Sequence, residues 1–349
     1  MMRVNCWLDR DHVFYHTARF LSGLWLLHQA GEISLRFVVR AERAGGTPPT
    51  DSALPLEIES GGKTRKILAD FRDRSDLFWA DGLSQCDVYF KRSYYVPDLP
   101  PGHAGKILPL GLNFTCRVPG LTGAVCRAVA PRLISSPSLF FSWLRRQIRC
   151  ATLVPALKDL ERGPTEPVRG AVIFQTRLWE DSDLDSRGAA EQINQSRASV
   201  VRCLRDSLGD RFYGGLIPTP LARRQFPELL APQSGRKSRY LKIARSHLIG
   251  VYTAGLNQST AWKFGEYLAA SQCIVADPPG NAVPKPLIEG RHYLAFSNPQ
   301  ECVAACRRLL DDPTFAESMR KANHEYYERE LAAHIWVRNR LSEALSPVD

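Results

Sequence analysis

Short apolar runs alternate with segments of helical periodicity along the first half of the chain. The run from Val4 to Leu8 predicts a strand, and the apolar spacing from Tyr15 to Gln29 predicts a helix with one buried face. Gly61-Gly62-Lys63 predicts a hairpin turn between two later strands. Further strands are expected at Leu35–Arg40, Leu54–Glu59, Ile67–Phe71, Asp87–Arg92 and Lys106–Gly111. This alternation predicts an α/β domain over residues 1–160.

The same alternation restarts after a Pro-containing stretch at 158–169, which we expect to be a linker. Strands are expected at Ala171–Gln175, Phe212–Ile217, His247–Tyr252, Cys273–Asp277 and Tyr293–Phe296. Helices are expected at Ala189–Leu208, Tyr240–Ser246, Ser259–Ala270, Pro299–Leu310 and, with a break, from Pro313 to about Leu345. Repeated strand–helix–strand units predict a parallel sheet whose ligand lies beyond the carboxyl ends of its strands. We therefore expect a second α/β domain at 168–325 and a closing helix at 326–349.

Composition narrows the class of protein. The chain has 349 residues, of which 44% are hydrophobic, so it is long enough for two domains that each bury a core. No apolar run approaches the roughly 20 residues of a membrane-spanning helix, and no signal-type apolar block follows the N-terminus. The nine cysteines contain no C-x-x-C pair, which predicts reduced thiols rather than disulfides or a zinc site. We expect a cytoplasmic protein without a bound metal.

The net charge of +10 indicates an anionic partner. Nucleotide phosphates and an acidic membrane surface both fit, whereas nucleic acid does not, because the arginines are dispersed and no recognition motif is visible. One stretch, 139–149, mixes Phe and Leu side chains with Arg145, Arg146 and Arg149. Two interpretations stay open: a helix that contacts the inner membrane face, or a packing helix whose arginines face water.

Residues 250–269 carry the most specific chemistry. A strand runs into a turn, and the predicted helix after it offers backbone N–H groups and the positive end of its dipole to a phosphate. Lys263 and Glu266 share one face of that helix, where they either meet a phosphate and sugar hydroxyls or form a surface ion pair. The candidate ligand-binding residues of this window are Gly255, Asn257, Gln258, Ser259, Lys263 and Glu266.

Residues 245–330 resemble the C-terminal domain of GT-B fold glycosyltransferases of the group 1, or GT4-like, family. The resemblance rests on five ordered blocks: Lys263-Phe-Gly-Glu-Tyr-Leu-Ala-Ala-Ser271, Cys273-Ile-Val-Ala-Asp-Pro-Pro-Gly280, Ile288-Glu-Gly-Arg-His-Tyr-Leu-Ala-Phe296, Leu309-Leu-Asp-Asp-Pro313 and Asn323-His-Glu-Tyr-Tyr327. It implies two Rossmann-like domains that face each other across a cleft, with a C-terminal helix that packs back towards the first domain.

The resemblance also implies an activity. The chain is expected to transfer a sugar from a nucleotide-sugar donor to a glycan or lipid-linked acceptor in bacterial surface polysaccharide synthesis, without a metal or other cofactor. A sugar-nucleotide epimerase or a non-catalytic nucleotide-sugar-binding protein of the same fold is the alternative.

Family residues carry over at a few positions. Glu266 is expected to bind the ribose of the donor. Gln258 stands where retaining members have a Glu that touches the transferred sugar, so inversion and retention both stay open. Phe174-Gln-Thr-Arg-Leu-Trp179 is similar to a strand end whose Arg contacts the diphosphate, which makes Arg177 a second donor-site candidate. A pair between Arg177 and a neighbouring carboxylate such as Glu180 is the alternative.

An inverting reaction also needs a general base next to the acceptor hydroxyl. Loops that follow the first strand line the ligand crevice in such domains, and here that loop contains Asp11 and His12, with His16 one turn further. Asp11 and His12 are therefore the expected catalytic residues. The alternative is that Asp9 or Asp11 caps the following helix. The triplet Asp9-Arg10-Asp11 is interpreted as loop carboxylates rather than a metal site.

Overall fold

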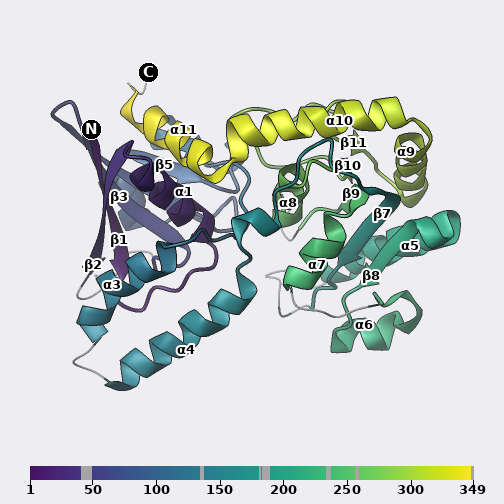
Figure 1. Cartoon of the computed structure of the whole chain (residues 1–349), viewed down its shortest axis with the longest axis horizontal. Helices are drawn as coiled ribbons and strands as arrows, with labels where there is room; N and C mark the ends of the chain where they lie inside the picture. Colours follow the sequence, from purple (N-terminus) through teal and green to yellow (C-terminus); the bar gives the residue numbers. More distant parts are fainter. Residues whose placement is uncertain are drawn as a thin grey trace.

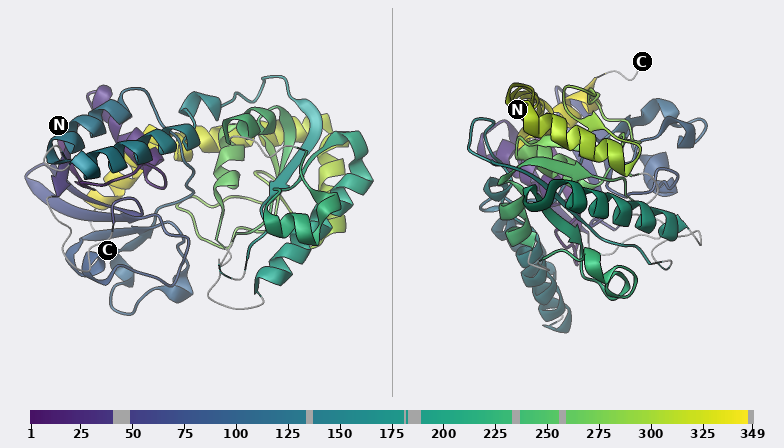
Figure 2. Two further views of the ribbon diagram at one scale, coloured as in Figure 1. Left: turned by 90° about the horizontal axis from the view of Figure 1, so that it is seen from below. Right: turned by 90° about the vertical axis from the view of Figure 1, so that its right-hand side faces the viewer.

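The computed structural model describes residues 1–40, 49–133, 137–180, 182, 189–232, 237–255 and 259–346. Two α/β lobes lie side by side, and the last helices of the chain run from the second lobe back to the first (Figure 1). The views in Figure 2 show the same two lobes from below and from the end of the second lobe.

The first lobe is built on a sheet with the order β2-β1-β3-β4-β5-β6. Strand β3 is antiparallel to both of its neighbours, and the other neighbouring pairs are parallel. The carboxyl ends of the parallel strands therefore meet at one edge, as the sequence predicts. A two-residue turn joins β3 to β4, and its Gly61 and Gly62 have φ values of 56° and 76°, which side chains rarely adopt. The strands are β1 Met2–Asp9, β2 Ile33–Arg40, β3 Ala53–Ser60, β4 Lys63–Asp70, β5 Val88–Lys91 and β6 Ile107–Pro109.

One face of this sheet carries most of the first core. Apolar side chains of β1, β4 and β5 pack there against α1, α3 and α11, whereas α2 covers the other face beside β4 and β5. Helix α1 starts at Ala18, three residues later than predicted, because residues 10–17 form the loop that leaves β1. The helices of this lobe are α1 Ala18–Gln29, α2 Ala80–Gln85, α3 Leu121–Leu133, α4 Pro137–Leu153 and α11 Ala333–Leu345.

The second lobe is built on a parallel sheet with the order β11-β10-β9-β7-β8. Alternate side chains of β9 and β10 face opposite sides: Val251 and Val275 pack under α5 and α9, whereas Tyr252 and Ile274 pack under α7 and α8. The strands are β7 Arg169–Thr176, β8 Phe212–Leu216, β9 His247–Tyr252, β10 Cys273–Ala276 and β11 Leu294–Ala295. The helices are α5 Ala189–Leu208, α6 Pro220–Gln225, α7 Lys237–Ala244, α8 Trp262–Ala269, α9 Pro299–Asp311 and α10 Pro313–Tyr326. This is the predicted doubly wound domain, and its strand order reverses between β7 and β9.

The chain returns to the first lobe through a break in its last long helix. After α10, a wider turn at Tyr327–Leu331 and an extended Ala332 lead into α11, which confirms the predicted break. Helix α11 lies against α1 so closely that a Cβ added at Gly23 of α1 would stand 2.2 Å from the carbonyl oxygen of Ala333. Arg19 of α1 is fully buried between the rings of Phe114 and Trp336, 4.1 and 4.2 Å from their centroids. The closing helix is thus part of the first core.

Candidate functional site

A buried arginine joins the carboxyl ends of β7 and β9, where the strand order of the second sheet reverses. Arg197 of α5 donates hydrogen bonds to the carbonyl oxygens of Arg177 (2.6 Å) and Ala254 (2.8 Å), and burial lowers its pKa to about 10. The amide of Ala254 in turn donates to the carboxylate of Asp277, just past β10, at 2.8 Å. Burial raises the pKa of Asp277. These contacts fix three adjacent strand ends at the edge where open α/β sheets bind ligands.

The loop after β7 presents the predicted arginine to solvent. Arg177 is exposed, and its guanidinium lies 4.7 Å from the centroid of the Trp179 ring. The backbone of Trp179 is held from both sides by the amide side chain of Asn194, which accepts from its N–H at 2.9 Å and donates to its carbonyl at 2.8 Å. Sequence reasoning missed Asn194 and Arg197 because only the fold brings α5 to this loop. The contact of Arg177 with a diphosphate stays a prediction.

The turn after β9 differs from the prediction. We expect a helix from Ser259, but α8 starts at Trp262. The carbonyl oxygen of Ser259 instead accepts the amide of Gly255 at 3.0 Å and the hydroxyl of Tyr252 at 3.2 Å, and Tyr252 also accepts the amide of Ala261 at 3.1 Å. These bonds to the strand keep Ser259–Ala261 out of the helix. The expected helix start was therefore wrong by three residues.

Gly255 lies inside this turn, where an added Cβ would stand 2.9 Å from the hydroxyl oxygen of Ser259. Ser259 itself is buried. Asn257 and Gln258, two further candidates, lie outside the described residues.

Charged side chains of α7 and α8 gather around the first half of α8. The Glu266 carboxylate is buried, and its Oε1 lies 2.7 Å from Nζ of Lys237, the first residue of α7. The ammonium of Lys237 also lies 5.1 Å from the centroid of the Trp262 ring. The expected alternative, a surface pair between Lys263 and Glu266, is not formed in the described part of the chain. Sequence reasoning missed Lys237 because the predicted helix began only at Tyr240.

Lys263 is the second cation of this cluster. Its Nζ lies 5.3 Å from the centroid of the Tyr240 ring, and among the described residues no carboxylate forms an ion pair with it. Burial lowers the pKa of Lys263 to about 7, against the opposing effect of Glu266, while Arg197 and Lys237 lower it further. This half-buried ammonium is therefore close to losing its proton at neutral pH, and an anion that binds next to it would restore the charge.

The first lobe reaches this cluster through two loops. The Trp262 ring lies against Tyr15 and His16 from the loop after β1, with centroids 5.1 and 5.3 Å apart. From the loop after β5, the buried guanidinium of Arg92 donates to the carbonyl oxygen of Thr260 at 3.0 Å. Burial and Arg92 lower the pKa of His16 to about 4, so its imidazole is neutral at pH 7. Carboxyl-edge loops of both sheets thus meet at the start of α8.

The two expected catalytic residues lie on the same loop but are differently placed. The His12 ring is buried, with Nδ1 2.9 Å from the Thr50 hydroxyl, and burial lowers its pKa to about 4. Asp11 is exposed, and its carboxylate lies 3.9 Å from Arg146 of α4. Of the three candidates on this loop, His16 is the one that contacts α8.

The capping alternative fails in the described residues. Thr17 occupies the N-cap of α1 without a side-chain hydrogen bond. Asp9 instead accepts from Arg40 at 2.7 Å and from the amide of Thr50 at 2.9 Å, which ties β1 to β2 and to residue 50.

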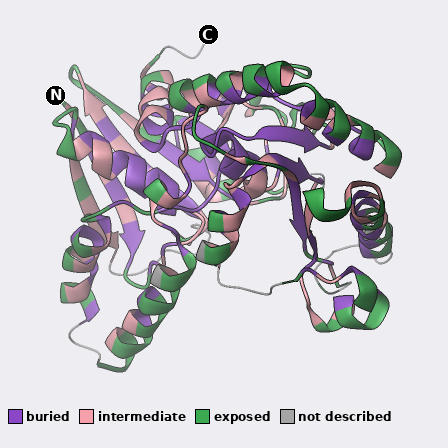
Figure 3. Ribbon diagram, turned by 45° about the vertical axis from the view of Figure 1, so that its right-hand side comes forward, coloured by how far each residue is buried: buried purple, intermediate pink, exposed green. Residues whose placement is uncertain are grey.

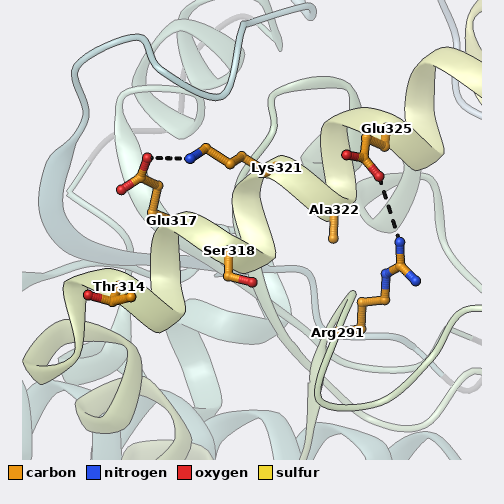
Figure 4. A pocket seen from close by; sticks show the side chains of 7 residues that line it. All are labelled: Arg291, Thr314, Glu317, Ser318, Lys321, Ala322 and Glu325. Atoms are coloured by element: carbon orange, nitrogen blue, oxygen red, sulfur yellow. Dashed lines mark ion pairs between the residues drawn. The ribbon is translucent and has the colours of Figure 1, made fainter.

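A depression on the outer surface is separate from these candidate residues. It runs along α10 and is lined by Arg291, Thr314, Glu317, Ser318, Lys321, Ala322 and Glu325 (Figure 4). Its charges face one another: Glu317 pairs with Lys321 at 2.7 Å, and Arg291 with Glu325 at 3.6 Å. None of the predicted site residues lines it.

Comparison with known proteins finds a family model that matches part of the chain. Residues 223–346 match a family model described as glycosyl transferase-like, and no curated protein is significantly similar to the chain. Similar solved structures include the C-terminal domain of a glycosyl transferase group 1 family protein from Francisella tularensis, with 10% identity, 47% of this chain and 87% of that chain covered, and a TM-score of 0.33.

Two further structures are similar over more of the chain. One is the UDP-GlcNAc 2-epimerase from Neisseria meningitidis bound to UDP-GlcNAc, with 13% identity, 75% of this chain and 63% of that chain covered, and a TM-score of 0.37. The other is MnaA of S. aureus in a co-structure with UDP, with 10% identity, 95% and 98% covered, and a TM-score of 0.40. At this distance they say nothing of the activity of this chain.

The doubly wound second sheet, the closing helix that returns to the first lobe and the family match agree with one another. They confirm the resemblance drawn from the five sequence blocks. The chain has the GT-B fold, and its residues 223–346 are similar to a family described as glycosyl transferase-like.

Proposed function

We propose that this protein is a glycosyltransferase that binds a nucleotide-sugar donor at the carboxyl edge of its second sheet and transfers the sugar to an acceptor hydroxyl. One observation carries the proposal: the Glu266 carboxylate of α8 is buried and fixed by Lys237, and Lys263 lies one turn before it on the same helix. A carboxylate that accepts from ribose hydroxyls, next to a cation that meets phosphate, matches the two halves of a nucleotide. The place matches as well, because the strand order reverses between β7 and β9.

The chemistry needs positive charge where the leaving group forms. As the glycosidic bond breaks, negative charge builds on the nucleoside diphosphate, and preorganised cations and N–H groups stabilise that charge in the transition state. We assign this role to Lys263, at the start of α8, and to Arg177, in the loop after β7. Arg197 acts as a positioning residue, because its two hydrogen bonds hold the loops that carry these groups.

For an inverting reaction we propose His16 as the general base. Its imidazole is neutral at pH 7 and lies against Trp262, at the junction of the two lobes. Within the described residues the hydrogen bond at His16 is the one that its backbone carbonyl oxygen accepts from Asn113, so the ring nitrogens are left for an acceptor hydroxyl. Asp11 and His12 stay predictions, and the acceptor class (a glycan or a lipid-linked sugar, in surface polysaccharide synthesis) is part of the proposal.

The test starts with the donor. We would screen UDP-, GDP-, ADP-, dTDP- and CMP-sugars for thermal stabilisation of the protein, and then follow a labelled sugar from the donor that binds. A transferase moves the label to an acceptor and releases the nucleotide. An epimerase changes the nucleotide sugar without any acceptor, and this result would favour the alternative activity.

A matched pair of variants tests the site itself. Glu266→Gln should weaken donor binding by about tenfold or more, because a charged hydrogen-bond acceptor for the ribose is lost. Glu317→Gln removes the same charge from α10 on the outer surface and should leave the affinity unchanged. Equal donor affinities for the two variants would reject the ribose role of Glu266.

A further inference from the structure

Helix α4 lies on the outside of the first lobe and packs with only one of its faces. Its buried Trp143 and Gln147 both donate to the carbonyl oxygen of His12, at 3.1 and 2.5 Å. The helix extends along the lower edge of the lobe in Figure 1, and most of its outer surface is exposed in Figure 3. The interpretation of this segment as a packing helix is therefore correct for the face that carries Trp143 and Gln147. It does not account for the opposite face.

The outer face is unusually apolar for a surface helix. Phe141 and Ile148, two turns apart on this face, are 66% and 60% exposed, and Leu139 and Leu153, near the ends of the helix and outside this face, are 44% and 41% exposed. Large apolar side chains scattered singly over a surface are ordinary, but here they gather on one helix. Moving Phe141 and Ile148 from water into an apolar phase would be favourable, with a free energy proportional to the apolar area that is buried.

The same face is strongly cationic. Arg145 lies one turn from Phe141 and from Ile148, and Arg149 is exposed beside it. The helix contains no Asp or Glu, and the whole segment 99–158 holds eight Lys or Arg residues and no acidic residue. Most of the net charge of +10 is therefore concentrated in this segment.

We propose that α4 docks the protein on an anionic lipid bilayer. Phe141 and Ile148 enter the boundary between headgroups and acyl chains, while Arg145 and Arg149 bind lipid phosphates. The apolar side chains favour a membrane over a dissolved polyanion, which would use the arginines and leave Phe141 in water. In the part of the chain that the structure describes, no helix is long and apolar enough to cross a membrane, so the contact is peripheral.

The position of α4 relates this surface to the site. Through the carbonyl oxygen of His12, α4 supports the loop after β1, and four residues further this loop reaches Trp262 with His16. Helix α4 thus lies between a membrane bound to its outer face and the loop that we assign to the acceptor side. The docking proposal does not depend on the transferase activity, because lipid binding is measured without a donor.

The experiment is co-sedimentation of the full chain with vesicles. Vesicles of phosphatidylglycerol and phosphatidylcholine in equal parts should bind it, and vesicles of phosphatidylcholine alone should bind it far less. The double variant Arg145→Gln/Arg149→Gln should lose about 30-fold in partition coefficient, at roughly a factor of five for each arginine near the surface. The matched control Arg223→Gln/Arg224→Gln removes two exposed arginines from α6 and the same net charge, and should bind as the wild type does.

A second pair of variants tests the apolar contact. Phe141→Ser/Ile148→Ser should lose about tenfold or more in partitioning at unchanged net charge, whereas Ile288→Ser, at a site 51% exposed on the second lobe, should not. Because all these side chains are exposed, the melting temperatures should stay close to that of the wild type. Failure of the wild-type chain to bind anionic vesicles would overturn the proposal. So would unchanged binding of the apolar variant, which would indicate a site for dissolved polyanions.

Discussion

The proton on Lys263 offers the sharpest test of the donor site. Burial holds the pKa of this ammonium at about 7 in the free protein, so it is half charged at neutral pH. A diphosphate bound within ion-pair distance favours the charged form and raises the pKa again. Donor binding should therefore take up a proton whenever the pH lies between the two pKa values.

The size of the pH effect on donor affinity follows from the interval between these two pKa values. Below about pH 7 the lysine already carries its proton, and the affinity should hardly vary with pH. Above it, each binding event must take up a proton, so the affinity should fall about tenfold per pH unit, or about 100-fold between about pH 6 and about pH 9. The direction is fixed by the depressed pKa: high pH weakens binding.

Isothermal titration calorimetry with the intact nucleotide sugar measures this directly. Its diphosphate has no titrating group in this range, and buffers of different ionisation enthalpy report the number of protons taken up. We expect about half a proton at pH 7 and nearly one at pH 8. Lys263→Arg keeps its charge at every pH and should bind without proton uptake, whereas Lys263→Met should bind weakly throughout. A pH-independent affinity of the wild type, or an unchanged profile in Lys263→Met, would refute the placement of a diphosphate at this side chain.

Three further outcomes are expected. His16→Asn should lower kcat by about 100-fold with little change in donor affinity, because only proton transfer is lost; a larger loss in Asp11→Asn than in His16→Asn would move the role of base to Asp11. Gly23→Val should reduce the free energy of unfolding by about 1–3 kcal/mol, and with it the melting temperature, because the added carbons meet the backbone of α11. Gly105→Ala, at a position with open space around its Cα, is the control. Equal melting temperatures of the two variants would contradict the close contact. EDTA should leave transfer largely intact, since arginine and lysine supply the charge; complete loss of turnover, restored by a divalent cation, would count against this mechanism.

Much of the fold was predictable because it depends on local patterns. The strands of both sheets and the break after α10 follow from short apolar runs and helical periodicity, which act within a few residues. The start of α8 was not predictable in this way. There, Tyr252 on the strand binds the peptide groups of Ser259 and Ala261 and overrides their tendency to join the helix.

The candidate site likewise contains residues that the sequence predicted and residues that it did not. The resemblance pointed to Glu266, and the spacing of charged residues pointed to Lys263, which lies on the same short helix. Lys237 and Arg197 come from other helices, and only the fold places them beside β9. Similarly, the sequence does not distinguish His12 from His16, because both follow the first strand. In the structure His12 packs against Thr50 and His16 against Trp262. Such differences arise from contacts between distant segments, which no single window of sequence contains.

The return of α11 to the first lobe has a consequence for biosynthesis. Trp336, Val337 and Leu341 of α11 belong to the core that also contains side chains of β1, β4 and β5, so this core closes only after α11 has been synthesised. During translation the second lobe can complete its sheet while the first lobe still lacks α11. Completion of the first lobe is thereby postponed until α11 has been synthesised, and a product terminated before α11 would expose that unfinished interior to chaperones and proteases.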